Sequence, residues 1–151
     1  MGKFRKTLLA LAVSCGVVLS VVLGAAPAQA SGFGYDGTYP GACATGSVVA
    51  ASYPILTSGG VSVGTEEVRY SPSCGTNWVR AYTTLSGYSM DKIITRTSSP
   101  YYQTTPEFDP SPGWSYSPQV YAPGSTCIVA QVYMYPAGGG PFYGSSTHAV
   151  C

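Results

Sequence analysis

The sequence predicts an all-β protein: a small antiparallel sandwich or barrel with two disulfides, preceded by a cleaved signal peptide. Beyond residue 30, segments rich in Val, Ile, Thr, Tyr and Trp are separated by clusters of Gly, Ser, Pro and Asn, as strands are by turns. No stretch in that part keeps a helical apolar period for three turns. Four cysteines remain there, and an even number in an exported domain predicts a disulfide framework.

Residues 1–30 have the three parts of a secretory signal peptide. Three basic residues near the start precede an apolar run at residues 8–23 and a small-residue site at residues 28–30. An uncleaved membrane anchor is the alternative, since such a span needs about 18 apolar residues. We favour cleavage after Ala30 because the run stops before an A-x-A site. We therefore expect a secreted, extracellular protein with no membrane contact after cleavage.

The remaining chain is expected to hold one domain, with residues 31–40 as an extended N-terminal arm and residues 41–151 as a disulfide-bonded β-domain. It carries four basic and six acidic side chains, a formal net charge of −2. Such a surface offers no electrostatic footprint for nucleic acid or for anionic lipid. All thirteen tyrosines of the chain lie in this part, and tyrosine is a residue that builds contact surfaces at low entropic cost.

Six segments are expected to form strands. Pro54 in the first segment fits an edge position or a bulge. In the fifth segment, apolar residues at even positions alternate with mixed residues at odd positions, so we expect one buried and one amphipathic face. The segments are residues 47–57, 61–71, 77–85, 93–97, 127–135 and 142–150.

The cysteine spacing predicts which cysteines pair. If the first two strands form a hairpin closed at residues 58–60, the midpoint between Cys43 and Cys74 falls in that turn, so the two sulfurs meet at its open end. The midpoint between Cys127 and Cys151 likewise falls at the centre of the Gly-Gly-Gly cluster that follows the fifth strand. We therefore predict the disulfides Cys43–Cys74 and Cys127–Cys151 over the other two connectivities.

Two segments are candidates for partner binding. Residues 98–124 hold six prolines, four tyrosines and a tryptophan, too many prolines for a central strand. This stretch fits a surface connection with aromatics packed back onto the sheet, or an exposed loop that grips a partner or a glycan. Residues 31–40 fit a floppy tail or an extended arm that adds to a partner surface. The candidate binding residues are Gly32, Phe33, Gly34, Tyr35, Asp36, Tyr39, Tyr101, Tyr102, Trp114 and Tyr116.

Catalytic and metal-binding groups are few. The only histidine, His148, is predicted to face Ala130 in the last hairpin as a structural or solvent-facing side chain. A zinc site is disfavoured because no cysteine pair has C-x-x-C spacing. G-x-S-x-G, H-E-x-x-H and phosphate-loop motifs are absent from the sequence. We therefore expect no enzyme, no metal and no cofactor.

A ribonuclease-like site is the catalytic alternative. It would combine the imidazole of His148 with a carboxylate and an arginine for proton transfer and phosphate binding. The same charged residues fit an ion pair between strands equally well, and that interpretation is favoured. They are Glu66 or Glu67, with Arg69 or Arg80.

Four blocks of the sequence resemble a known family. They read YDGT at residues 35–38, GTEEVRYS at 64–71, CGTNWVR at 74–80 and YAP at 121–123. Together they resemble the YjfA-like domain of unknown function, found in secreted proteins of actinobacteria and bacilli, over about residues 35–135. The resemblance implies a small β-domain without established catalytic residues.

Some small exported actinobacterial proteins of this kind are adaptors in umbrella-shaped antibacterial toxin particles, joining a trypsin-fold lectin to a repeat-built stalk. The resemblance thus implies a binding or adaptor module, with residues 31–40 as the arm that enters the lectin. Three alternatives stay open: a carbohydrate- or cell-wall-binding module, a small secreted nuclease or inhibitor, and a solitary envelope protein. The carbohydrate module predicts that Tyr101, Tyr102, Trp114 and Tyr116 form one exposed platform.

Overall fold

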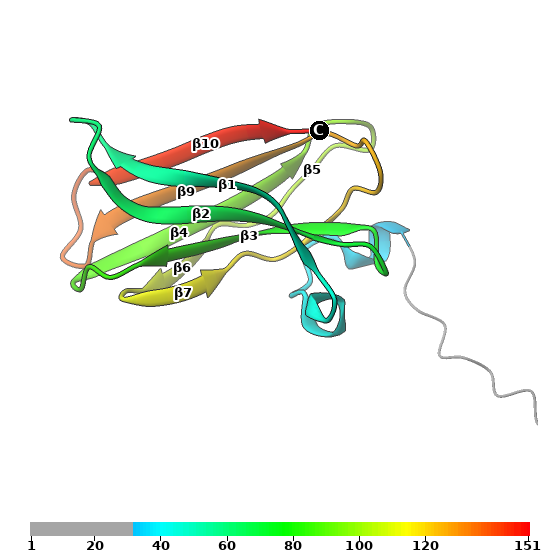
Figure 1. The fold of residues 1–151 in the computed structure, drawn as a ribbon, viewed down its shortest axis with the longest axis horizontal. Coiled ribbons are helices and arrows are strands. Elements are labelled where there is room, and N and C mark those ends of the chain that lie inside the picture. Colours follow the sequence, from blue (N-terminus) through cyan, green and yellow to red (C-terminus); the bar gives the residue numbers. More distant parts are fainter. Residues whose placement is uncertain (1–31) are drawn as a thin grey trace, which may run out of the picture.

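The computed structural model describes residues 32–151, and they form a curled antiparallel sheet, a half-barrel, which confirms the all-β prediction (Figure 1). The predicted signal peptide lies outside the described residues. Six long strands make up most of the sheet: β1 (Val48–Thr57), β2 (Ser62–Ser71), β3 (Thr76–Thr83), β4 (Tyr88–Arg96), β9 (Ile128–Pro136) and β10 (Gly144–Val150).

Each predicted strand has a counterpart among these six, and the one large difference is at β4. This strand begins at Tyr88, five residues before the predicted start. The added stretch contains two charged residues, Asp91 and Lys92, and both side chains are buried in the sheet. The amine of Lys92 is matched by the carboxylate of Asp109, 2.8 Å away. A distant partner therefore allows charges in a strand that the sequence pattern alone disfavours.

Residues 98–124 differ from the predicted surface connection, because they contribute four short strands to the sheet. They are β5 (Tyr102–Gln103), β6 (Glu107–Pro110), β7 (Gly113–Tyr116) and β8 (Val120–Tyr121). The strand order is β5-β4-β9-β10-β1-β2-β3-β7, with β6 also on β4 and β8 also on β3. All four therefore lie at the sheet edges, where prolines are tolerated.

The two edges of the sheet are linked directly by the chain. β6 pairs with β4 at one edge and β7 pairs with β3 at the other, and only residues 111–112 separate these two strands. The apolar core fills the inside of the curve, where alternate residues of each strand point. Its side chains larger than alanine are Ile55, Val68, Val79, Met90, Ile94, Val120, Ile128, Val132 and Met134.

Both predicted disulfides are confirmed. Cys43 bonds to Cys74 with a Cα–Cα distance of 5.7 Å, and Cys127 bonds to Cys151 with a Cα–Cα distance of 4.1 Å. Each closes the open end of a hairpin, as the spacing predicted. By the loop-entropy model each bridge stabilises the fold by about 3.5 kcal/mol. The predicted register is also confirmed, since His148 pairs with Ala130.

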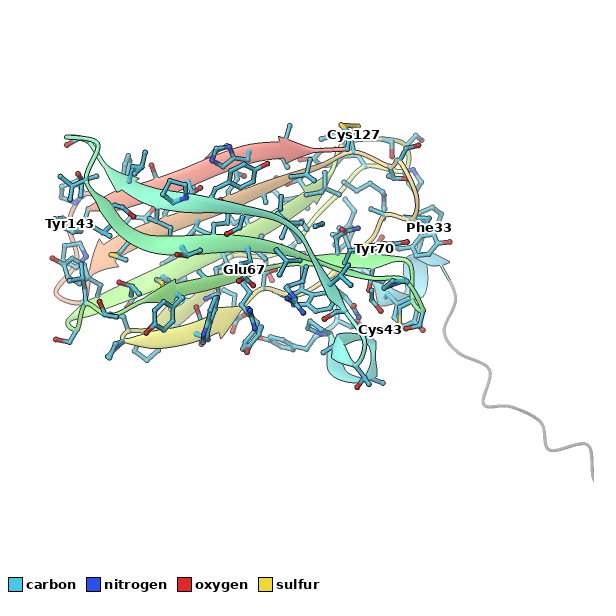
Figure 2. The ribbon with its side chains drawn as sticks, in the orientation of Figure 1. Phe33, Cys43, Glu67, Tyr70, Cys127 and Tyr143 are labelled. Carbon is cyan, nitrogen blue, oxygen red and sulfur yellow. A yellow bond between two sulfur atoms is a disulfide. The ribbon has the colours of Figure 1, made fainter. Side chains whose placement is uncertain are left out.

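The N-terminal segment differs from the predicted extended arm, because its described residues fold onto the sheet. Gly32–Tyr35 form a short 3-10 helix, η1, whose Phe33 ring lies edge-on to Tyr121 at 5.5 Å. Asp36 then forms an ion pair with Arg96 of β4. Figure 2 shows Phe33 at the end of the sheet that carries Cys127, with Tyr143 at the opposite end. A second 3-10 helix, η2 (Gly41–Ala44), carries Cys43.

Candidate binding groove

A groove of about 500 Å³ lies where the two sheet edges approach one another. One wall comes from β2, β3 and β7, the other from β6, and η2 with the residues before it closes one side. The lining residues are Tyr39, Pro40, Gly41, Ala44, Ser47, Arg69, Trp78, Arg80, Glu107, Asp109 and Tyr116.

A charged network organises the first wall. Glu67 and Arg80 are directly opposite one another on β2 and β3, and the Nε and Nη2 atoms of Arg80 both donate to Oε2 of Glu67. Nη1 of Arg69 lies 3.7 Å from the same carboxylate oxygen. Nη2 of Arg69 donates to both the carbonyl and the hydroxyl of Ser47, each at 2.9 Å. The two guanidinium groups are therefore held in place before any ligand arrives.

Aromatic rings surround these guanidinium groups. The Arg80 guanidinium lies 3.9 Å from the centre of the Trp114 ring, a cation–π contact. Trp78, opposite Arg69 in the register, is almost fully buried beneath the groove. Tyr116, opposite Arg80, and Tyr39 are both exposed and line the groove. A buried aromatic residue at the bottom, with exposed tyrosines around it, is typical of contact surfaces between proteins.

The second wall is acidic. Glu107 and Asp109 project from β6, and Asp109 accepts a hydrogen bond of 2.8 Å from the buried amine of Lys92. Burial lowers the pKa of Lys92, an effect that this hydrogen bond partly offsets. A hydrogen bond to Glu107 raises the pKa of Tyr39, so the phenol stays protonated as a donor. The groove therefore has one guanidinium-bearing wall and one carboxylate-bearing wall.

The structure brings some of the predicted binding residues together and separates others. Tyr39 and Tyr116 line the groove, and Trp114 stacks beside it on Arg80. Tyr101 and Tyr102 lie elsewhere, at β5, which pairs with the Arg96 end of β4. The four aromatic residues of the predicted carbohydrate platform therefore do not share one surface.

The predicted residues of the N-terminal segment contribute to packing. Phe33 lies between Tyr121, whose ring it meets edge-on, and the guanidinium of Arg96, which lies 4.6 Å from the centre of the Phe33 ring. Asp36 accepts hydrogen bonds from Arg96 and from the backbone amide of Tyr121. Gly32 and Gly34 lie within η1, and Tyr35 ends it.

The candidate nuclease residues do not converge in one cleft. Glu66 and Glu67 point to opposite faces of β2, so that Glu66 is fully buried in the core while Glu67 lies beside the groove. His148 stacks on Tyr53, with ring centres 3.6 Å apart and planes 10° apart. The favoured sequence interpretation, an ion pair between strands, is confirmed for Glu67 with both arginines.

Sequence reasoning missed Trp78, Glu107 and Asp109 as groove residues. Trp78 could have been found, because it alternates with core residues along β3 and so belongs to the face of Arg80. Glu107 and Asp109 gave no such signal, since their place at the groove depends on the pairing of β6 with β4, which no local pattern in the sequence indicates.

Among residues 32–151, no group of three or more His, Cys, Asp or Glu side chains is placed to hold a metal ion. No helix in that same range has the length and apolar character needed to cross a membrane. The resemblance to the YjfA-like domain stays a prediction. No protein-family model, no curated protein and no solved structure matches the chain.

Proposed function

We propose that this protein is a secreted, non-catalytic binding module that joins partners in an extracellular assembly, and that the groove is its contact site. The observation that carries the proposal is the preformed network of Glu67, Arg69 and Arg80, set among exposed aromatic side chains. Arginine, tyrosine and tryptophan are the residues that most often dominate binding energy at protein interfaces.

Preorganisation supports this role. Arg80 is fixed by Glu67 and by Trp114, and Arg69 is fixed by Ser47, so their side chains lose little freedom when a partner binds. The Cys43–Cys74 disulfide ties η2 to the turn between β2 and β3, which holds that side of the groove in position. A rigid site of this kind gains affinity because less conformational entropy is lost on association.

The two walls define the chemistry of the partner. A polypeptide loop that carries both a carboxylate and a basic side chain complements the guanidinium wall and the acidic wall at once. In the toxin-particle version of this proposal, the partners are a trypsin-fold lectin and a repeat-built stalk. The groove, rather than a free N-terminal arm, then makes one of the two contacts, since η1 and Asp36 are docked on the sheet.

Affinity purification tests the proposal. The full chain with a C-terminal tag is expressed in its own host and recovered from the culture supernatant, and co-purifying proteins are identified by mass spectrometry. Wild-type protein is expected to recover partner proteins in stoichiometric amounts. The double variant Tyr39→Ala/Tyr116→Ala is expected to lose the partner that occupies the groove, because it removes both exposed tyrosines of the rim.

Tyr101→Ala is the matched control, because Tyr101 is 63 % exposed but does not line the groove. It is expected to recover the same partners as wild-type protein. Recovery of no stoichiometric partner by the wild-type chain would contradict the binding role. Equal recovery by the double variant would contradict the assignment of the groove.

A further inference from the structure

A second surface carries a row of four aromatic rings, and it begins on the opposite face of β6, the strand that forms the acidic wall of the groove. It lies on the side of β6, β4 and β9 that faces away from the core. Phe108 and Tyr135 have ring centres 6.0 Å apart, Tyr135 and Tyr133 are 6.5 Å apart, and Tyr133 and Phe142 are 5.7 Å apart. We call Phe108, Tyr135, Tyr133 and Phe142 the aromatic row.

The aromatic row stands on a regular piece of sheet. The pairing of β9 with both β4 and β10 runs without a register shift over the whole length of the strands. Phe108, Asp91 and Tyr133 lie side by side across three strands, so their side chains share one face. Phe108 is 59 % exposed and Phe142 is 52 % exposed, which leaves both ends of the row open to solvent.

The groups around the rings are polar but almost free of charge. Pairing places Ser145 beside Tyr133 and Thr147 beside Gln131 on the same face. The amide of Gln131 donates a hydrogen bond of 2.9 Å to the phenol oxygen of Tyr133, which fixes that hydroxyl. The strands under the row place a single ionisable carboxyl on this face, Asp91, which is only 5 % exposed.

Asp91 points to a ligand that donates hydrogen bonds. Its Oδ1 atom is buried and has no hydrogen-bond partner among the described residues. A buried acceptor without a partner is costly. Asp91 lies between Phe108 and Tyr133 in the register, so a ligand hydroxyl could reach this oxygen if one of the two rings turned aside.

We propose that the aromatic row is a binding platform for an uncharged polysaccharide of pyranose sugars. The apolar faces of sugar rings pack on aromatic rings, while sugar hydroxyls exchange hydrogen bonds with serine, threonine, glutamine and carboxyl groups. An anionic polymer or an anionic lipid surface would need exposed basic side chains, and the row has none. The row and the groove use opposite faces of β6, so one module could hold a protein partner and a glycan at once.

Co-sedimentation with insoluble chitin and with amorphous cellulose tests the proposal, using the full secreted chain. Wild-type protein is expected to sediment with at least one of the two polymers. The double variant Phe108→Ala/Phe142→Ala is expected to bind at least about tenfold more weakly, since each lost stacking contact lowers the affinity. Both side chains are more than half exposed, so the variant is expected to keep its melting temperature, which circular dichroism checks.

The groove variant Tyr39→Ala/Tyr116→Ala is the matched control and is expected to sediment like wild-type protein. Failure of the wild-type chain to sediment with either polymer would overturn the platform. So would equal sedimentation by the Phe108→Ala/Phe142→Ala variant. If that variant instead loses a co-purifying protein while sugar binding is unchanged, the row is a protein contact and the proposal is wrong. None of these outcomes depends on whether the groove binds a partner.

Discussion

The guanidinium of Arg96 holds the carboxylate of Asp36 through two hydrogen bonds, of 2.9 and 2.8 Å, although the two residues are 60 positions apart. Both side chains are more than nine-tenths buried. The pair is further tied by Tyr121, whose amide donates to Asp36 and whose carbonyl accepts from Arg96. This contact fixes the start of the described chain to the sheet.

Replacing Asp36 with alanine is therefore expected to destabilise the fold by about 3 kcal/mol, because it leaves the buried charge of Arg96 without a counter-charge, bonded only to backbone carbonyls. Urea unfolding followed by tyrosine and tryptophan fluorescence measures the change. Tyr101→Ala, at an exposed position, is the control and is expected to change stability little. A loss below about 0.5 kcal/mol for Asp36→Ala would show that the N-terminal segment does not contribute to the fold.

The buried carboxyl of Glu66 should make the stability of the fold depend on pH. Burial in the core raises its pKa from 4.5 to about 6, and the nearby hydroxyl of Ser146 offsets only part of this effect. The folded protein thus holds this proton more tightly than the unfolded chain. The contribution of the Glu66 proton to the free energy of unfolding is fully present below about pH 4.5 and is lost as the pH rises through about 6.

The variant Glu66→Gln removes that titration while keeping the side-chain shape. It is expected to be more stable than wild-type protein by about 2 kcal/mol at pH 8, with a much smaller difference at pH 4. Urea unfolding at the two pH values measures both. Glu67→Gln is the control, since it lies on the opposite face in ion pairs, and it is expected to gain no stability at pH 8. A pH-independent effect of Glu66→Gln would contradict the interpretation.

The two disulfides are expected to stabilise the fold by similar amounts, but only one of them is expected to affect partner binding. Replacing either pair with serine should lower the free energy of unfolding by about 3 to 4 kcal/mol. Only the loss of Cys43–Cys74 releases η2, which supplies Gly41 and Ala44 to the groove. Partner recovery per folded molecule should therefore fall for Cys43→Ser/Cys74→Ser and stay unchanged for Cys127→Ser/Cys151→Ser. Equal recovery by both variants would show that η2 does not shape the site.

Arg80→Lys tests whether the guanidinium geometry matters beyond its charge. Lysine keeps the positive charge but cannot reproduce the fork toward Glu67 or the stacking on Trp114. Partner affinity, measured by calorimetry with the purified partner, is expected to fall by about tenfold, with a stability change within about 1 kcal/mol. Unchanged affinity would show that Arg80 acts only as a charge.

The part of the fold that was predictable depends on patterns local in sequence. Alternating residues and turn clusters located six strands, and the spacing of Cys43 with Cys74 and of Cys127 with Cys151 identified both hairpins. Those signals work because the two strands of a hairpin are neighbours in the chain, so every pair of opposite residues has its sequence midpoint in the turn.

What could not be predicted depends on contacts between distant segments. The docking of Asp36 requires knowledge of where Arg96 lies, and the acidic wall requires knowledge that β6 returns to β4. Proline-rich composition correctly excluded a central strand from residues 98–124 but could not reveal short edge strands. The predicted tyrosines therefore identified part of the groove, through Tyr39 and Tyr116, without its charged walls.

The link of two residues between β6 and β7 has a mechanical consequence. Glu107 and Asp109 lie at one edge of the curved sheet, whereas Arg80 and Tyr116 lie at the other. How tightly the sheet bends therefore sets the gap between opposite charges. Substitutions that change the volume of core side chains, although these do not line the groove, would widen or narrow that gap. They would therefore change the size of the partner segment that the groove accepts.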